Sequence, residues 1–214
     1  MSTILIPTPD TPFFSADNTD SDDGGQIISA DFTADSDDGY LGTEGSDLIF
    51  TLGGDDAVLA GGGDDEVNAG AGNDSISGGE GNDSIALGEG NDLGLGGLGN
   101  DVLNGGLGND LLYGGFGDDL VIGDSGDDIL VGGFGDDTLE GGEGADTFVF
   151  RNVPGVDTII GFNAEEDQIV FEGIDKDAVD VVYDAETGSL SIDGEDVAIL
   201  DPGLALDEDD FTFM

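Results

Sequence analysis

Residues 96–113 read GGLGNDVLNGGLGNDLLY, which is two consecutive copies of one nine-residue unit. Twelve such units fill residues 42–149 in a single unbroken frame. Position 4 is Gly and position 6 is Asp in every copy, and position 8 is the only regularly apolar position. Because one short unit cannot bury its own apolar side chain, this period predicts a solenoid whose neighbouring copies stack into a continuous core.

Within each unit we expect a loop over positions 1–6 and a three-residue strand over positions 7–9. Position 5 is mostly Asn or Asp, which tolerate a left-handed conformation best among residues other than Gly. Since the middle residue of the strand points inward, the expected core column is Ile49, Val58, Val67, Ile76, Ile85, Gly94, Leu103, Leu112, Val121, Leu130, Leu139 and Phe148. Gly94 is the one gap in this column. The pattern closes a turn every 18 residues and predicts an all-β parallel β-roll, in which two parallel sheets share one apolar seam.

The Asp at position 6 has a chemical consequence in such a roll. Strands stacked about 4.8 Å apart bring the carboxylates of loops n and n+2 to nearly that spacing, where like charges repel strongly in a partly dry site. A cation between them removes the repulsion, and hard oxygen ligands in a flexible loop suit Ca²⁺ better than Mg²⁺. Twelve loops paired in this way offer up to ten sites, whose twenty positive charges would face 24 Asp and Glu within the repeats.

The units closely resemble the repeats-in-toxin (RTX) hemolysin-type calcium-binding repeat. This resemblance covers half the chain and implies a parallel β-roll whose ions are held by the position-6 Asp and by main-chain carbonyls of the first four positions. The Asp ligands are Asp47, Asp56, Asp65, Asp74, Asp83, Asp92, Asp101, Asp110, Asp119, Asp128, Asp137 and Asp146. The position-4 glycines are Gly45, Gly54, Gly63, Gly72, Gly81, Gly90, Gly99, Gly108, Gly117, Gly126, Gly135 and Gly144.

Three copies depart from the pattern in ways that bear on the sites. Thr51-Leu52 and Leu87 replace early glycines, Asp124 puts an acid at position 2, and Gly94 lacks the core side chain. Sites near these residues are the doubtful ones.

The composition excludes several classes of function. Only two basic residues stand against 51 acids, for a net charge of −49, so nothing could neutralise nucleic-acid phosphate. Without Cys or His there is no disulfide, thiolate or His-based zinc site. No apolar run is long enough to span a membrane. The alternative to the roll is a disordered acidic chain, to which high charge and few apolar residues often lead.

The segments beside the repeats differ from them. Residues 1–41 predict an acidic disordered leader, with Ile27–Phe32 as an alternative cap strand. Residues 150–214 predict a β-rich C-terminal cap. Its expected strands, beginning within the last repeat, lie at 147–150, 157–162, 167–174, 179–184, 189–193 and 196–200.

The C-terminal sequence also points to a route of export. The runs ADTFVF, DTIIGF and DQIVF resemble the region after the roll in serralysin-type and other type I-secreted proteins. The residues Asp210–Met214 resemble a type I export signal, whereas the N-terminus carries no usual secretory signal. We therefore expect export through the type I secretion machinery and folding on calcium in the extracellular space.

An enzyme is not expected. The serralysin zinc motif HExxHxxGxxH needs His, and no GxSxG elbow is present. The remote alternative is an accessory domain of a secreted enzyme. The main expectation is a calcium-binding protein with a structural or interaction role, and the alternative is an adhesin, surface-layer or self-assembling matrix protein.

The alternative rests on apolar side chains that should point outward from one sheet. They are Leu93, Leu95, Leu111, Tyr113, Ile129 and Val131, joined by Leu98, Phe116 and Phe134 along one row of loops. Exposed apolar ladders of this size usually contact something. We expect the face to be covered by strands from 157–200 of the same chain or by a second copy.

Overall fold

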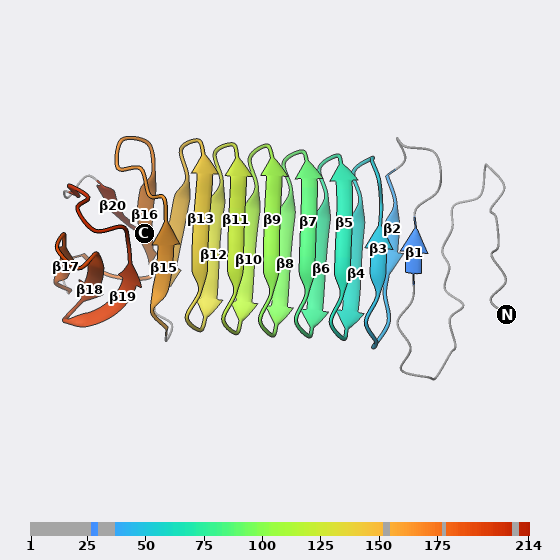
Figure 1. Cartoon of the computed structure of the whole chain (residues 1–214), viewed down its shortest axis with the longest axis horizontal. Helices are drawn as coiled ribbons and strands as arrows, with labels where there is room; N and C mark the ends of the chain where they lie inside the picture. Colours follow the sequence, from blue (N-terminus) through green and yellow to red (C-terminus); the bar gives the residue numbers. More distant parts are fainter. Residues whose placement is uncertain (1–26, 30–36, 152–154, 177–178, 207–209) are drawn as a thin grey trace, which may run out of the picture.

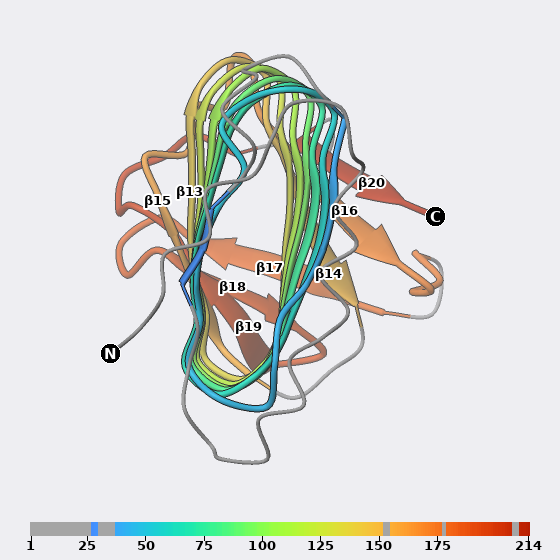
Figure 2. The same cartoon turned by 90° about the vertical axis from the view of Figure 1, so that its right-hand side faces the viewer.

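The computed structural model describes residues 27–29, 37–151, 155–176, 179–206 and 210–214. In this part of the chain the strands form two long sheets that lie face to face along the length of the molecule (Figure 1). Seen along the long axis, successive coils superimpose almost completely (Figure 2). The predicted all-β parallel β-roll is confirmed.

The two sheets divide the strands by parity up to β16, and we name them sheet A and sheet B. Sheet A contains, in spatial order, β1 (Ile27–Ser29), β3 (Leu48–Phe50), β5 (Glu66–Ala71), β7 (Ser84–Glu89), β9 (Val102–Leu107), β11 (Leu120–Ser125), β13 (Thr138–Glu143), β15 (Asp157–Ile160), β19 (Glu195–Ile199), β18 (Ser189–Ile192) and β17 (Val181–Asp184). Sheet B contains β2 (Gly39–Leu41), β4 (Ala57–Gly62), β6 (Ser75–Glu80), β8 (Leu93–Leu98), β10 (Leu111–Phe116), β12 (Ile129–Phe134), β14 (Thr147–Arg151), β16 (Gln168–Glu172) and β20 (Phe211–Phe213).

Each strand of the roll pairs in parallel with the strands two repeats before and after it. In β10, for example, Leu112 lies opposite Gly94 of β8 on one side and Leu130 of β12 on the other. Equivalent positions therefore form straight columns, and the predicted contact between loops n and n+2 is confirmed.

The predicted division of the repeat into a six-residue loop and a three-residue strand is wrong. From β4 to β13 the strands have six residues, which occupy positions 7–9 of one repeat and 1–3 of the next. Glycine at position 2 makes this length possible, since the backbone bends there at φ 115° in Gly61 while pairing continues beyond it. Leu52 and Asp124 adopt the same left-handed region at φ 73° and 80°. Only positions 4–6 form the turn.

The predicted left-handed conformation of position 5 is also wrong. Among the described residues other than Gly, only Leu52, Asp124 and Asp193 have positive φ. The position-5 side chain instead accepts a hydrogen bond from the backbone N–H of position 5 in the next loop of its row. Asp55 Oδ1 thus accepts from Asn73 N at 2.7 Å. Asn and Asp are selected here because their short side chains reach a neighbouring amide.

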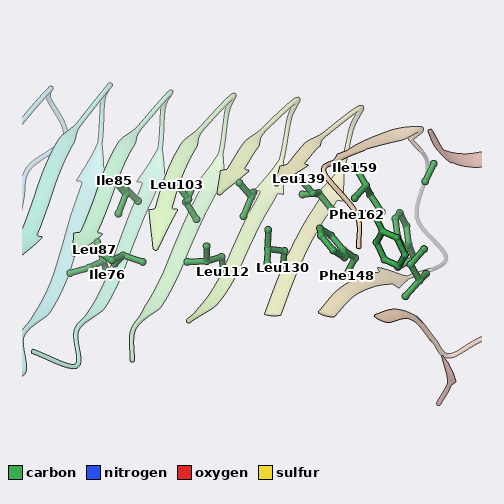
Figure 3. Packing of buried hydrophobic residues seen from close by; sticks show 14 of the residues in the cluster. Ile76, Ile85, Leu87, Leu103, Leu112, Leu130, Leu139, Phe148, Ile159 and Phe162 are labelled. Atoms are coloured by element: carbon green, nitrogen blue, oxygen red, sulfur yellow. The ribbon is translucent and has the colours of Figure 1, made fainter. Parts of the chain in front are cut away.

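The core of the roll consists mainly of position-8 side chains, which point inward from both sheets and meet between them (Figure 3). Each side chain predicted for this column is buried to within 1% of complete. Leu87, at position 1, fills the space beside Gly94. A Cβ added to Gly94 would lie 2.9 Å from Leu87 Cδ1 and 3.1 Å from Leu112 Cδ2. The departures at Leu87 and Gly94 thus compensate for each other.

The six strands expected around the C-terminal region are all present, as β14 to β19. β15 and β16 continue the parallel ladders, whereas β17, β18 and β19 form an antiparallel meander. A turn at Asp193-Gly194 joins β18 to β19, with φ 54° and 83°. These strands lie at the end of the roll opposite β1 (Figure 1).

The predicted cover of the apolar face by residues 157–200 is found only at one end of the face, where Tyr113 and Val131 border a hollow that Ile174, Ile192 and Val197 also line. The strands of this segment otherwise extend the two sheets lengthwise. Leu95 and Ile129 are 36% and 40% exposed, although Val131 is buried. The Arg151 guanidinium lies 5.6 Å from the centre of the Tyr113 ring on this side. Cover by a second copy stays a prediction.

At the other end, β1 pairs in parallel with β3, at the place expected for a cap strand. Most of the predicted leader, residues 1–26 and 30–36, lies outside the described residues.

Candidate metal centre

Two columns of carboxylates run along the two edges of the roll, where the turns are. The position-6 Asp of the odd-numbered repeats forms one column and that of the even-numbered repeats forms the other. All twelve predicted Asp are buried, with 1–4% of their surface exposed. The structure therefore brings together the side chains that the sequence singled out.

One carboxylate oxygen of each Asp is fixed by the backbone of its neighbour. Asp110 N donates to Asp128 Oδ1 at 2.8 Å, and Asp92 N donates to Asp110 Oδ1 at the same distance. The same bond, 18 residues apart, links neighbours along both columns at 2.7–3.0 Å. The ladder of backbone amides thus holds every carboxylate in one orientation.

The other oxygen of nearly every Asp has no partner among the described groups. These atoms are the Oδ2 of Asp56, Asp65, Asp74, Asp83, Asp92, Asp101, Asp110, Asp119, Asp128, Asp137 and Asp146. A buried carboxylate oxygen without a hydrogen bond or a cation carries a large desolvation cost. Eleven of them in two files point to a bound cation.

Asp47 begins its column and differs from the rest. Thr43 N donates to Asp47 Oδ2 at 2.6 Å, and the Thr43 hydroxyl lies 3.1 Å from both carboxylate oxygens. Its second oxygen is therefore satisfied within its own loop.

Glycine at position 1 leaves space in front of most of the unpartnered oxygens, whereas the repeats of Asp56, Asp65, Asp74 and Asp92 have Thr51, Ala60, Ala69 and Leu87 at this position. A Cβ added to Gly105 would collide with Asp110 Oδ2 and would lie 2.9 Å from the carbonyl oxygen of Gly123 in the next loop of the row. Gly114 repeats the arrangement with Asp119 Oδ2 and Gly132 O. A carboxylate from one loop and a carbonyl from the next thus border the same glycine-lined space.

The position-4 glycines lie between neighbouring loops as well. A Cβ on Gly72 would collide with the carbonyl oxygen of Gly54, and one on Gly81 with that of Gly63. This close approach explains why position 4 is invariably Gly. Coordination by the position-4 carbonyls stays a prediction, since the contact shows only that they face the gap between loops.

The donor set fits a calcium ion. It consists of carboxylate and carbonyl oxygens, which are the ligands Ca²⁺ takes in flexible loops. Among the described residues, no three acidic side chains gather at one point. Main-chain oxygens would therefore supply much of the coordination in each gap.

Burial shifts the acidity of the columns. Desolvation raises the pKa of Asp65, Asp74, Asp92 and Asp101 to about 6. It raises the pKa of Asp119 and Asp128 to about 7, with further increases from carboxylates along the same column. Backbone hydrogen bonds partly oppose these increases. Without a cation, the carboxylates of the columns therefore take up protons at a higher pH than an ordinary Asp does.

Thr51 changes one gap. Its hydroxyl donates to the carbonyl oxygen of Ala69 at 2.7 Å, which is the position-1 carbonyl of the next loop in that row. Desolvation by burial raises the pKa of Asp56 in this loop as well. The Thr51 hydroxyl is thus hydrogen-bonded to a carbonyl oxygen whose equivalents in later loops face a glycine, as at Gly105 and Gly114.

Three further Asp extend the columns beyond the repeats and were missed from the sequence. Asp38 N donates to Asp56 Oδ1 at 2.8 Å, Asp137 N to Asp157 Oδ1 at 3.1 Å, and Asp146 N to Asp167 Oδ1 at 3.0 Å. The signal was present in DTII and DQIVF, where an Asp stands two residues before an inward apolar side chain, as Asp146 does before Phe148. Insertions that change the spacing from 18 to 20 and 21 residues hide it.

Comparison with known proteins agrees with this geometry. A family model described as the RTX calcium-binding nonapeptide repeat matches residues 34–67, 41–75, 59–94, 95–130 and 122–151. These matches span more than half of the chain and end at residue 151, so the likeness of the later segment to serralysin-type proteins stays a prediction. No curated protein matches the chain. The described residues contain no helix that is long and apolar enough to cross a membrane. The matched repeats, with their stacked Asp columns, show that the chain belongs to the RTX calcium-binding nonapeptide repeat family and that its roll is a calcium-binding β-roll.

Proposed function

We propose that this protein is a secreted calcium-binding protein that folds when calcium binds outside the cell and then serves a structural or interaction role. The observation that carries the proposal is the double file of buried, unpartnered Asp Oδ2 atoms. A roll without cations would bury these oxygens at high cost, so calcium binding and folding are coupled.

The charge of the repeats supports this coupling. They hold 24 acidic residues and no basic one, so the compact state suffers strong self-repulsion. The twelve loops form two rows of six, so each row has five gaps between neighbouring loops. Ten calcium ions, one in each gap, would nearly neutralise the 24 acidic residues. Extracellular calcium modules are tuned to about 10⁻⁴ to 10⁻³ M, so the chain would stay unfolded where calcium is scarce.

An unfolded chain suits export by the type I route, for which RTX repeats are typical. The C-terminal residues that resemble an export signal form β20, which pairs with β16 in sheet B. In this proposal they are read while the chain is unfolded and join the fold only after calcium binds.

Calcium titration tests the proposal directly. Far-ultraviolet circular dichroism should show little β-structure in chelator and a cooperative gain of β-structure in millimolar calcium, with magnesium a poor substitute. A spectrum in chelator that already matches the calcium-loaded one would refute the coupling of folding to binding.

A role in adhesion or self-assembly is the second candidate, and one observation favours it. The rings of Phe116 and Phe134 stack with centroids 4.7 Å apart while the two residues remain 52% and 42% exposed. Leu98, 47% exposed, continues this row. If the row binds a second copy, Phe116→Ser should reduce the mass measured by light scattering in calcium without lowering thermal stability. An unchanged mass would count against this role.

We propose no catalytic activity for the chain. The buried Asp are accounted for as calcium ligands, and an enzyme would need other groups that act on a substrate.

A further inference from the structure

The loop that ends at Asp157 reproduces the connections of a calcium loop, although it lies beyond the twelve repeats. Val156 N donates to Asp136 Oδ1 at 2.9 Å, Asp137 N donates to Asp157 Oδ1 at 3.1 Å, and Thr158 N donates to the Asp137 carbonyl at 2.7 Å. Together they attach the segment 155–157 to the loop of the eleventh repeat.

The same three bonds join loops inside the repeats. Between the eighth and tenth repeats, Asp127 N donates to Asn109 Oδ1 at 3.1 Å, Asp110 N to Asp128 Oδ1 at 2.8 Å, and Ile129 N to the Asp110 carbonyl at 2.9 Å. Val156 therefore takes the place of position 5, and Asp157 that of position 6.

Gly155 takes the place of position 4. Its φ is 147°, and a Cβ at this residue would collide with the carbonyl oxygen of Gly135. Gly135 stands in the same relation to the carbonyl of Gly117. The close approach between loops, which makes position 4 invariably Gly in the repeats, thus continues one step further.

The gap between the two loops contains an unpartnered ligand atom. Asp137 is 1% exposed, and its Oδ2 has no hydrogen-bond partner among the described groups. Asp157 is 8% exposed. Two buried carboxylates that face one gap carry a charge that neither the backbone amides nor solvent can compensate fully.

We propose that Gly155–Asp157 is a thirteenth calcium loop, which together with Asp137 forms a calcium site outside the repeats. The inference rests on the proposed function, in which the roll binds calcium. Carboxylate and main-chain oxygens are again the available donors, so the ion is Ca²⁺. The site would fasten the start of the C-terminal region, through β15, to the end of the repeats.

The Asp157→Asn variant tests this site. Asparagine keeps the oxygen that accepts from Asp137 N–H but removes the charge, so the ladder can remain while the ion is lost. We expect isothermal titration calorimetry to find one calcium ion fewer per chain than in the wild type, with the same circular dichroism at saturating calcium. A wild-type count in this variant would overturn the inference.

Asp201→Asn is the matched control. Asp201 Oδ2 accepts a hydrogen bond from Gly161 N at 3.1 Å in the C-terminal region, and the residue is exposed. The control therefore removes the same charge near the same region without touching the columns, and it should keep the wild-type count. Loss of one ion in both variants would overturn the inference. If the wild type itself binds no calcium, the proposed function fails instead.

Native mass spectrometry keeps the test decisive if Asp157→Asn folds only in part. The folded population carries few charges and separates from the unfolded one, so its bound ions can be counted alone. One ion fewer on the folded Asp157→Asn chain supports the thirteenth loop, and an unchanged number refutes it.

Discussion

The repeats and the C-terminal region share two continuous sheets but are held together in different ways. In the repeats, about one large apolar side chain per unit, aliphatic in every unit but the last, is buried between two columns of carboxylates. In the C-terminal region, Phe171 contacts the rings of Phe150, Phe211 and Phe213, and Arg151 forms an ion pair with Glu172 at 2.6 Å. The same sheet architecture can therefore depend on ions in one part and on aromatic packing in the other.

This difference follows from the length of chain available to each turn of the roll. A nine-residue unit has two inward positions, 8 and 1, of which position 1 is mostly Gly, so each unit buries about one large side chain. It must use glycine and Asp in its turns. The C-terminal segments are longer and less regular, so they supply large side chains from several directions. Burial of an aromatic ring removes much more apolar surface from water than a single Val or Ile does.

The largest effect should come from a ligand in the middle of the repeats. Asp110→Ala removes an unpartnered oxygen and the acceptor for Asp92 N–H, and its loop has neighbours on both sides. We expect cooperative loss of folding at calcium concentrations that fold the wild type, because nearest-neighbour contacts dominate in solenoids.

Asp47→Ala is the control, with a smaller expected shift. Asp47 lies in the first repeat, and Thr43 satisfies its second oxygen. Calcium midpoints from circular dichroism compare the two variants. Equal shifts of the calcium midpoint in the two variants would show that a central loop contributes no more to folding than the first loop does.

The next effect concerns pH and should arise in the two carboxylate columns, including Asp157, whose pKa desolvation raises to about 7. Desolvation raises the pKa of Asp119 and Asp128 in the folded chain to about 7, against 3.8 for an ordinary Asp. The folded ion-free roll thus binds more protons than the unfolded chain between these values, and its stability decreases as pH rises through them. In chelator, acidification from about pH 8 to about pH 5 should increase β-structure.

The calcium-loaded form provides the comparison for this experiment. Protons compete with calcium for the same carboxylates, so the calcium midpoint should rise as the pH is lowered over that range. If pH changes neither the spectrum in chelator nor the midpoint, the raised pKa values do not govern the stability of the roll.

An intermediate effect is expected in the C-terminal region. Phe171→Ala removes a fully buried ring with three aromatic neighbours and should lower the free energy of unfolding by about 3–5 kcal/mol. Urea denaturation at saturating calcium measures the loss. The calcium midpoint should move much less than in Asp110→Ala. A larger shift of the midpoint in Phe171→Ala than in Asp110→Ala would show that the two regions do not differ in their dependence on calcium.

The smallest effect should come from the compensating pair within the repeats. Leu87→Gly opens a cavity beside Gly94 and should cost about 2–5 kcal/mol. The double variant Leu87→Gly/Gly94→Leu returns both positions to the usual repeat pattern and should recover most of the loss. Thermal denaturation in calcium measures both. If the double variant is no more stable than Leu87→Gly alone, the two positions do not share one space.

The periodic sequence determined the architecture of residues 42–149. A fixed nine-residue period allows only columns of identical positions, so the core column, the 18-residue offset and the two files of Asp could be read from it directly. The strand boundaries could not be read in the same way. Glycine at position 2 lets a strand bend and continue, and neither its φ nor the pairing beyond it follows from residue type.

Only the tertiary structure determined the contacts at irregular repeats and beyond the last repeat. Leu87 fills the space beside Gly94 because the two residues meet across the core, although they are at different positions of the same unit. Asp157 and Asp167 join the columns because backbone amides of Asp137 and Asp146 reach them after insertions in the loops. The C-terminal strands continue the sheets lengthwise because the last strands of the roll present open hydrogen-bonding edges. Sequence periodicity thus fixes contacts between equivalent positions, whereas contacts between unlike positions depend on distances that exist only in the folded chain.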